Sequence, residues 1–302
     1  MDWIGRIFAF RLNNVSLKME SLDLVECPRD AMQGVKQWIP TQQKIVYAQA
    51  LLKVGFSTLD IGSFVSPKAI PQMRDTAEVL NALDRSESKT ELLTIVANLR
   101  GAVDACAHPE VDWLGYPFSI SENFQMRNTH KTIEESKIVL EQIINLTKEN
   151  DKKLVVYLSM GFGNPYGDPW SPAIVAHWVD YLSQLGVSTI SLSDTVGSAT
   201  LPIIEQLFTT LIPAFPKVAL GAHLHARFAD AIPKIEAAYS SGCRRFDTAI
   251  KGYGGCPMAK DELVGNLPTE KLLSFFSTHK IEHQLNPLHF ESAYNQCLKT
   301  FI

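Results

Sequence analysis

Short apolar runs recur at regular intervals along the chain and alternate with amphipathic segments. Eight of these runs have the length and residue types of β-strands: LDLVEC (22–27), TLDIG (58–62), LLTIVA (92–97), VDWLGYPF (111–118), LVVYLSM (154–160), STISLS (188–193), KVALGAH (217–223) and RRFDTA (244–249). Near-continuous apolar runs are typical of strands that are buried on both faces of a parallel sheet. The pattern therefore predicts eight parallel strands.

The segments between these runs have helical spacing of their apolar residues, as in Ile45, Ala48 and Leu52. Ser171 followed by Pro172 is typical of a helix start, because serine caps the first turn and proline fits its first position. Eight alternating strands and helices in a chain of this length predict an α/β fold, a closed (β/α)8 TIM barrel. An open doubly wound sheet is the alternative, but no Gly-x-Gly-x-x-Gly motif follows the first strand.

The same series predicts one catalytic domain over residues 1–302, with the barrel at about 22–280 and a helical C-terminal extension after it. Apolar positions stay dense after residue 267, yet no ninth strand follows. We expect the start, MDWIGRIFAFRLNNVSLKME, to be a short N-terminal extension, since it lacks the apolar region and cleavage site of a signal peptide. An organelle-targeting role is the alternative for this segment.

Composition excludes several classes of partner. The formal net charge of −4 offers no basic surface for nucleic acid or for an anionic membrane. No apolar run reaches the roughly 18 residues of a membrane span. The five cysteines are odd in number and include no Cys-x-x-Cys pair, which argues against a disulfide framework and a structural zinc site. A reducing cytoplasm fits this cysteine content.

His223 and His225 are the most informative pair in the chain. Residues i and i+2 of a strand point to the same face, so the two imidazoles emerge together where a buried strand ends. Asp30 follows the first apolar run and Asn266 follows the last glycine-rich loop, and active sites of such barrels lie at these strand ends. A carboxylate, two imidazoles and an amide carbonyl suit Mg²⁺, Mn²⁺ or Co²⁺ and leave positions open for a bidentate substrate. Taken singly, Asp30 is equally explained as a turn or capping residue, and Asn266 is better explained as a turn residue after Gly265.

Four further residues with reactive or charged side chains are predicted at the same end of the barrel. We place Arg29 at the end of the first strand, where it could stabilise an enolate or a carboxylate, or form an ordinary salt bridge. Cys256 lies in KGYGGCPMAK, where glycines allow a mobile loop, and could exchange protons with carbon acids or be an inert small residue. Asp60 and Asp194, predicted at the ends of the second and sixth strands, could orient ligands, pair with Arg29 or cap the strands.

Five segments together resemble the 3-hydroxy-3-methylglutaryl-CoA (HMG-CoA) lyase family: ECPRDAMQ, DIGSFVSPKAIPQM, SLSDTVGSAT, GAHLHARF and GYGGCPMAKDELVGNLPTE. This family belongs to a metallolyase group of barrel enzymes that also contains isopropylmalate and homocitrate synthases. The likeness extends from about residue 22 to residue 275. SFVSPK and the Gly-Gly-Cys-Pro loop favour the lyases, whereas Pro-Arg-Asp and His-x-His mark the wider group.

The resemblance implies a retro-Claisen cleavage of HMG-CoA to acetyl-CoA and acetoacetate, a reaction of leucine degradation and of ketone-body formation. It implies that a divalent cation, Mg²⁺ or Mn²⁺, is bound by four residues: Asp30, His223, His225 and Asn266. The base that takes the 3-hydroxyl proton is left open between Asp30 and His223. The expected partner is an acyl-CoA substrate, with neither nucleic acid nor membrane, and we expect a homodimer in the cytoplasm.

The resemblance also implies roles for residues outside the metal set. Arg29 would stabilise the enolate of the departing acetyl-CoA, and Cys256 would protonate that carbanion. Asp60 stands where the lyases have a glutamate, and Gln33 and Asp194 would line the site.

The chain also departs from the usual lyase pattern. Ala226 and Arg227 replace the Asp-Thr that usually follows the second histidine, and Ala31 and Met32 replace Gly-Leu. The loop between Cys256 and Asn266 is one residue longer than the common pattern, and Met258 replaces an aromatic residue. These differences leave the four metal ligands intact and bear on the identity of the acyl-CoA substrate.

Two other functions stay open at this point. One is a Claisen-condensing synthase of the same barrel group, which would join an acyl-CoA to an α-keto acid. The other is a barrel that binds a metal or an acyl-CoA without turnover.

Overall fold

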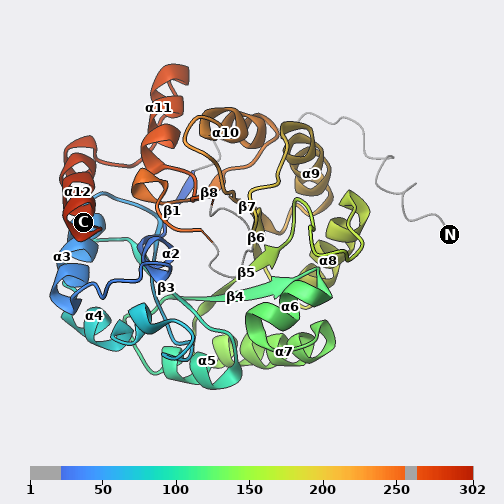
Figure 1. Cartoon of the computed structure of the whole chain (residues 1–302), viewed down its shortest axis with the longest axis horizontal. Helices are drawn as coiled ribbons and strands as arrows, with labels where there is room; N and C mark the ends of the chain where they lie inside the picture. Colours follow the sequence, from blue (N-terminus) through green and yellow to red (C-terminus); the bar gives the residue numbers. More distant parts are fainter. Residues whose placement is uncertain (1–21, 256–263, 302) are drawn as a thin grey trace.

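The structure, a computed structural model, describes residues 22–255 and 264–301. Eight parallel strands pair in the order of the chain, and the last pairs with the first to close a barrel (Figure 1). The predicted TIM barrel is confirmed, and the open sheet is excluded. The strands are β1 (Asp23–Glu26), β2 (Thr58–Ser63), β3 (Glu91–Ile95), β4 (Trp113–Ser119), β5 (Lys153–Ser159), β6 (Thr189–Ser193), β7 (Ala219–His223) and β8 (Arg245–Thr248).

Helices form a ring around the outside of the barrel, as Figure 1 shows. The predicted helix start at Ser171 is confirmed, because its hydroxyl accepts a hydrogen bond from the backbone N–H of Ile174. The helices are α2 (Pro28–Gln33), α3 (Thr41–Leu52), α4 (Thr76–Ala82), α5 (Leu99–Cys106), α6 (Glu122–Thr129), α7 (Ile133–Glu149), α8 (Pro172–Gln184), α9 (Leu201–Ala214), α10 (Ala231–Ser240), α11 (Thr269–His279) and α12 (Pro287–Thr300), with short 3₁₀ turns at Pro71–Met73 and Ile250–Gly252.

The apolar core has two parts. The larger one fills the layer between strands and helices and includes Tyr116 and Phe118 of β4. A small cluster inside the barrel consists of Leu93, Ile95, Val155 and Tyr157. Gly115 of β4 leaves room for it, since a Cβ atom there would lie 2.5 Å from the Ile95 Cδ1 atom. The remaining barrel interior is therefore open to polar side chains.

The C-terminal helices complete the ring. Helix α11 is the next helix along the chain after α10 among the described residues other than the 3₁₀ turn, and α12 packs against α3, with Ala293 and Cys297 buried. This arrangement agrees with the predicted last barrel helix followed by a helical extension. The predicted N-terminal extension lies outside the described residues. In the described ranges no helix is both long and apolar enough to cross a bilayer.

Candidate active site

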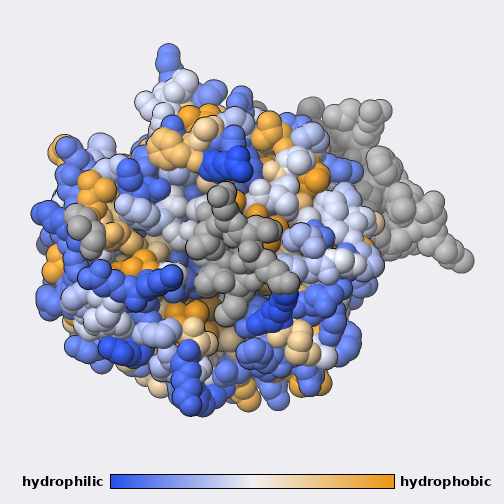
Figure 2. All heavy atoms as spheres, viewed as in Figure 1, coloured by the Kyte–Doolittle hydropathy of each residue, from blue (hydrophilic) through white to orange (hydrophobic). Residues whose placement is uncertain are grey.

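A cavity of about 280 Å³ opens at the carboxyl ends of the strands. Its lining includes the last residue of each of five strands: Ser63, Ile95, Ser159, Ser193 and His223. Figure 2 shows that the molecule's visible face is mainly hydrophilic at its rim, with apolar residues in scattered patches. Because it is lined by the carboxyl ends of the strands, the cavity lies where the barrel fold predicts an active site.

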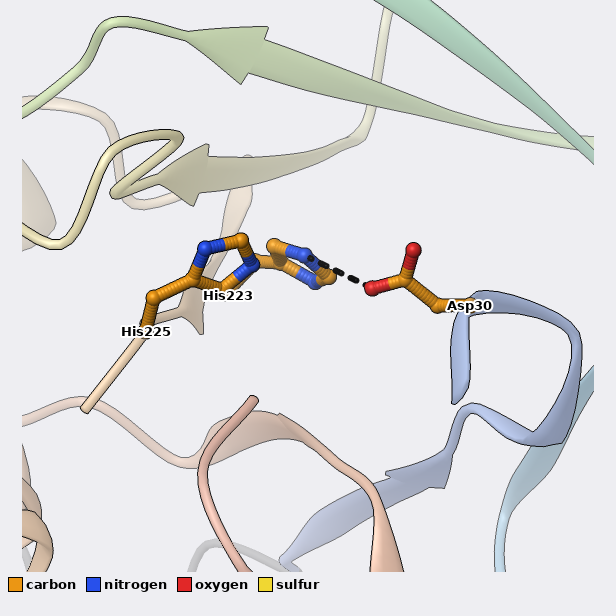
Figure 3. Close-up of side chains that lie close together, drawn as sticks. All are labelled: Asp30, His223 and His225. Carbon is orange, nitrogen blue, oxygen red and sulfur yellow. Dashed lines mark ion pairs between the residues drawn. The ribbon is translucent and has the colours of Figure 1, made fainter. Parts of the chain in front are cut away.

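Asp30, His223 and His225 converge at this cavity, from α2 on one side and β7 on the other (Figure 3). One potential ligand atom from each residue lies within 4.8 Å of the other two. The Nε2 atom of His223 is 3.7 Å from Oδ2 of Asp30. Residues almost 200 positions apart in the chain thus form a group of the size that one metal ion needs.

Asn266 joins this group through the backbone and the side chain. It forms an isolated antiparallel β-bridge with His225 and is 1% exposed. Its Nδ2 atom donates to the carbonyl oxygen of Tyr253, and its side chain helps to lower the pKa of Asp30. A Cβ atom on Gly254, which has φ of +103°, would lie 2.5 Å from this Nδ2 atom. Glycine is needed here so that the loop can approach the site.

The protonation states of His225 and Asp30 suit a cation. Burial and the neighbouring His223 lower the pKa of His225 to about 4, so its imidazole is neutral at pH 7. Its Nε2 atom is buried and has no hydrogen-bond partner among the described residues. Burial opposes ionisation of Asp30, but Arg29 and His223 lower its pKa below the usual value. An unpartnered imidazole nitrogen beside a carboxylate is what a metal ligand set provides before the ion binds.

Asp247 of β8 is a site residue that the sequence reasoning missed. Its Oδ2 atom lies 3.2 Å from Nδ1 of His223 and accepts a hydrogen bond from the Ser191 hydroxyl at 2.7 Å. Burial opposes the charged form of His223, but the hydrogen bond and charge of Asp247 raise its pKa above the usual value. The signal in the sequence was an acidic residue inside a buried strand, RRFDTA.

Arg29 and Asp30 lie in the first turn of α2. The sequence analysis had placed them at the end of the first strand, and this placement is wrong. Pro28 explains the difference, because proline fits the first position of a helix and ends β1 at Glu26. The guanidinium of Arg29 contacts Asp30 at 3.3 Å and donates to Gln33 Oε1 at 2.7 Å. The helix therefore presents Arg29, Asp30 and Gln33 to the cavity together.

Asp60 lies inside β2 and not at its end, and it pairs with Arg29 at 2.5 Å between Oδ2 and Nη2. Burial raises the pKa of Asp60 to about 6 although Arg29 favours its charged form. The predicted pairing of Asp60 with Arg29 is therefore present.

Asp194 directly follows β6 and does not line the cavity. Its carboxylate pairs with Lys234 of α10 at 2.9 Å and accepts from the backbone N–H of Ala199. Lys234 also donates to the carbonyl oxygen of His225 at 2.7 Å, so it links Asp194 to the backbone of the site. Lys234 was missed by the sequence reasoning. Cys256, the predicted proton donor, lies outside the described residues.

The sequence model of the HMGL-like family matches residues 24–296. A relative from Danio rerio, "3-hydroxy-3-methylglutaryl-CoA lyase, cytoplasmic", is 33% identical over 248 residues, which cover 82% of this chain and 72% of that protein. A relative from Pseudomonas aeruginosa, "3-hydroxy-3-isohexenylglutaryl-CoA/hydroxy-methylglutaryl-CoA lyase", is 31% identical over 246 residues, which cover 82% of this chain and 81% of that protein.

A solved structure is similar over almost the whole fold. It is an HMG-CoA lyase from Acinetobacter baumannii in complex with coenzyme A and 3-methylmalate. The TM-score is 0.85 at 28% identity, and the match covers 93% of this chain and 91% of that chain.

Proposed function

This chain belongs to the HMGL-like family, and we propose that it cleaves HMG-CoA to acetyl-CoA and acetoacetate with the help of a divalent cation. The observation that supports this most is the convergence of Asp30, His223 and His225 at the mouth of the barrel, with Nε2 of His225 left unpartnered among the described residues. The complex of the Acinetobacter relative with coenzyme A supports an acyl-CoA as the substrate.

We assign the cation to four residues: Asp30, His223, His225 and Asn266. Their oxygen and nitrogen donors suit Mg²⁺ or Mn²⁺. A bound divalent cation would act as a Lewis acid toward the 3-hydroxyl and carboxylate oxygens of the substrate.

The protein's own groups move protons and stabilise charge. Asp30 or His223 takes the proton of the 3-hydroxyl, so that this oxygen becomes the carbonyl of acetoacetate as the C2–C3 bond breaks. The electron pair of that bond passes to the acetyl-CoA enolate. Arg29 lies beside Asp30 and is fixed by Asp60, so its charge can stabilise the enolate oxygen without reorganisation. Cys256 then protonates the enolate carbon.

A second candidate substrate is a 3-hydroxyacyl-CoA with a longer substituent at C3. The cavity wall includes Val65, Ile70, Ile95 and Phe124. These apolar residues belong to β3 and to the segments after β2 and β4, and these three strands lie opposite β6, β7 and β8 in the closed barrel. The name of the Pseudomonas relative includes such a substrate.

For the whole protein we propose one catalytic domain and a homodimer in the cytoplasm. The family match over residues 24–296 supports the single domain. Sedimentation of the purified chain would measure the oligomeric state.

The proposed reaction is tested by assaying cleavage of HMG-CoA in one mixture and condensation of acetyl-CoA with an α-keto acid in another. We expect the metal-loaded chain to form acetyl-CoA from HMG-CoA and to release no free CoA when it is given acetyl-CoA and an α-keto acid. Release of free CoA only in the second mixture would identify a condensing synthase. Absence of turnover in both mixtures, and with a 3-hydroxyacyl-CoA that has a longer substituent at C3, would identify a binding protein.

A further inference from the structure

A buried row of polar side chains continues from His223 into the barrel interior. Below His223 lies Asp247, and below Asp247 lies Arg245, both on β8 and separated by one residue so that they point to the same side of the strand. Asp247 is 1% exposed and Arg245 is 2% exposed. A fully buried arginine in a barrel core is costly unless its charge is compensated.

Asp247 contacts the imidazole on the side that faces away from the cavity. Its Oδ2 atom is 3.2 Å from Nδ1 of His223, and the Ser191 hydroxyl holds the same oxygen at 2.7 Å. A proton on Nδ1 leaves the lone pair of His223 on Nε2, which is the nitrogen directed toward Asp30. The carboxylate therefore sets both the tautomer and the ring orientation of His223.

Arg245 supplies the opposite charge from below. Its Nη2 atom is 3.7 Å from Oδ1 of Asp247, while its Nη1 atom donates to Asp23 and its guanidinium lies 5.8 Å from the Trp113 ring centre. Gly221 of β7 makes this possible, because a Cβ atom there would lie 2.8 Å from Cδ of Arg245. The side chain thus has a fixed path through the barrel interior.

We infer that Asp247 and Arg245 are positioning residues for His223, with Arg245 acting through Asp247 to keep Nε2 of His223 available for the cation. This inference rests on the proposed use of a divalent cation at Asp30, His223 and His225. It assigns to the barrel interior a function beyond packing.

The test measures the affinity of the metal-stripped full-length chain for Mn²⁺ by calorimetric titration. We expect Asp247→Asn to weaken Mn²⁺ binding by about 10- to 100-fold, as loss of a carboxylate behind a histidine ligand does. The matched control is Asp75→Asn, which breaks another buried pair, with Lys44 at 2.8 Å, that includes none of the proposed metal ligands. This control should lose stability and keep its Mn²⁺ affinity.

A second pair of variants tests the order of action. Arg245→Met should weaken Mn²⁺ binding. Arg245→Lys keeps the positive charge and should bind Mn²⁺ more tightly than Arg245→Met does. In an Asp247→Asn background, Arg245→Met should change the affinity no further, because the residue through which it acts is already neutral. This double variant contains no unpaired Asp247 charge, so it can be measured even if Arg245→Met alone does not fold.

The outcomes separate this inference from the proposed function. If the wild type binds Mn²⁺ and Asp247→Asn binds it within twofold as tightly, or if Asp75→Asn weakens binding equally, the inference is wrong and the proposed function stands. If Arg245→Met weakens binding equally with and without Asp247, the assigned order of action is wrong. If the wild type binds no Mn²⁺ and turns over without metal, both fail.

Discussion

The guanidinium of Arg29 donates from Nε and Nη2 to the buried carboxylate of Asp60, at 3.1 Å and 2.5 Å. Arg29 also contacts Asp30, so this ion pair fixes a positive charge beside the proposed metal ligand. Asp60 belongs to β2 and Arg29 to α2, which means that the position of the charge is set by the barrel and not by a flexible loop. An enolate oxygen would meet a preorganised donor here.

Asp60→Asn should lower kcat for HMG-CoA cleavage by on the order of 100-fold, because a misplaced Arg29 no longer meets the developing charge. Asp60→Glu keeps the carboxylate and should retain more activity. Steady-state kinetics of the two variants make this comparison. Asp75→Asn controls for the loss of a buried ion pair, and equal losses of kcat in Asp60→Asn and Asp75→Asn would contradict a role for Asp60 in placing Arg29.

Removal of the cation should abolish cleavage. A chelator competes for the ion, and Mg²⁺ or Mn²⁺ should restore the rate in the wild type because the ligand residues remain in place. In His225→Ala the same additions should restore much less at equal metal concentration. Rates measured before and after chelation test this. Full activity of metal-stripped wild type would refute the site.

Cys256→Ser should lower kcat by about 10² to 10⁴-fold while Mn²⁺ affinity stays unchanged, because a hydroxyl is a much weaker acid than a thiol. Substrate should also protect the wild type from thiol-modifying reagents. Steady-state kinetics and Mn²⁺ titration of the same preparation measure kcat and the Mn²⁺ affinity. Near-normal turnover in the variant would mean that another group protonates the enolate.

Glu26 provides a prediction about stability and pH. Burial raises its pKa to about 8 in the folded chain, against an ordinary value of 4.5. Between these values the folded state binds the extra proton, so the free energy of unfolding contributed by Glu26 falls as pH rises. Glu26→Gln has no such group and should gain stability relative to the wild type between about pH 5.5 and about pH 8.5.

Chemical denaturation of both proteins at the two pH values measures this difference. The backbone N–H of Ile250 donates to one oxygen of Glu26, and the Thr269 hydroxyl at the other oxygen can accept a hydrogen bond from an amide, so glutamine is the suitable replacement. A stability difference that does not change with pH would show that Glu26 is ionised in the folded chain.

The sequence was sufficient for the barrel because strands that are buried on both faces are near-continuous apolar runs, and eight such runs alternate with helical segments. It was also sufficient to name Asp30, His223 and His225, since a barrel brings all carboxyl ends of its strands to one face. The sequence analysis wrongly placed Arg29 and Asp30 at the end of the first strand. They lie in a helix that begins at Pro28.

Asp247 and Lys234 were missed for a different reason. Both contact the site from behind, and their importance follows from the register between β7 and β8 and from the packing of α10, which local sequence patterns do not report. Asp194 was expected to line the site and instead pairs with Lys234. Residues at the strand ends follow from fold class, whereas the residues packed behind them follow from tertiary packing.

The most direct test of the account is to quantify products when the full-length chain, loaded with Mn²⁺, is incubated with HMG-CoA alone. Mass spectrometry should show acetyl-CoA and acetoacetate in equal amounts, and neither product should form after chelation. Unchanged HMG-CoA in the presence of bound metal would contradict the proposed reaction.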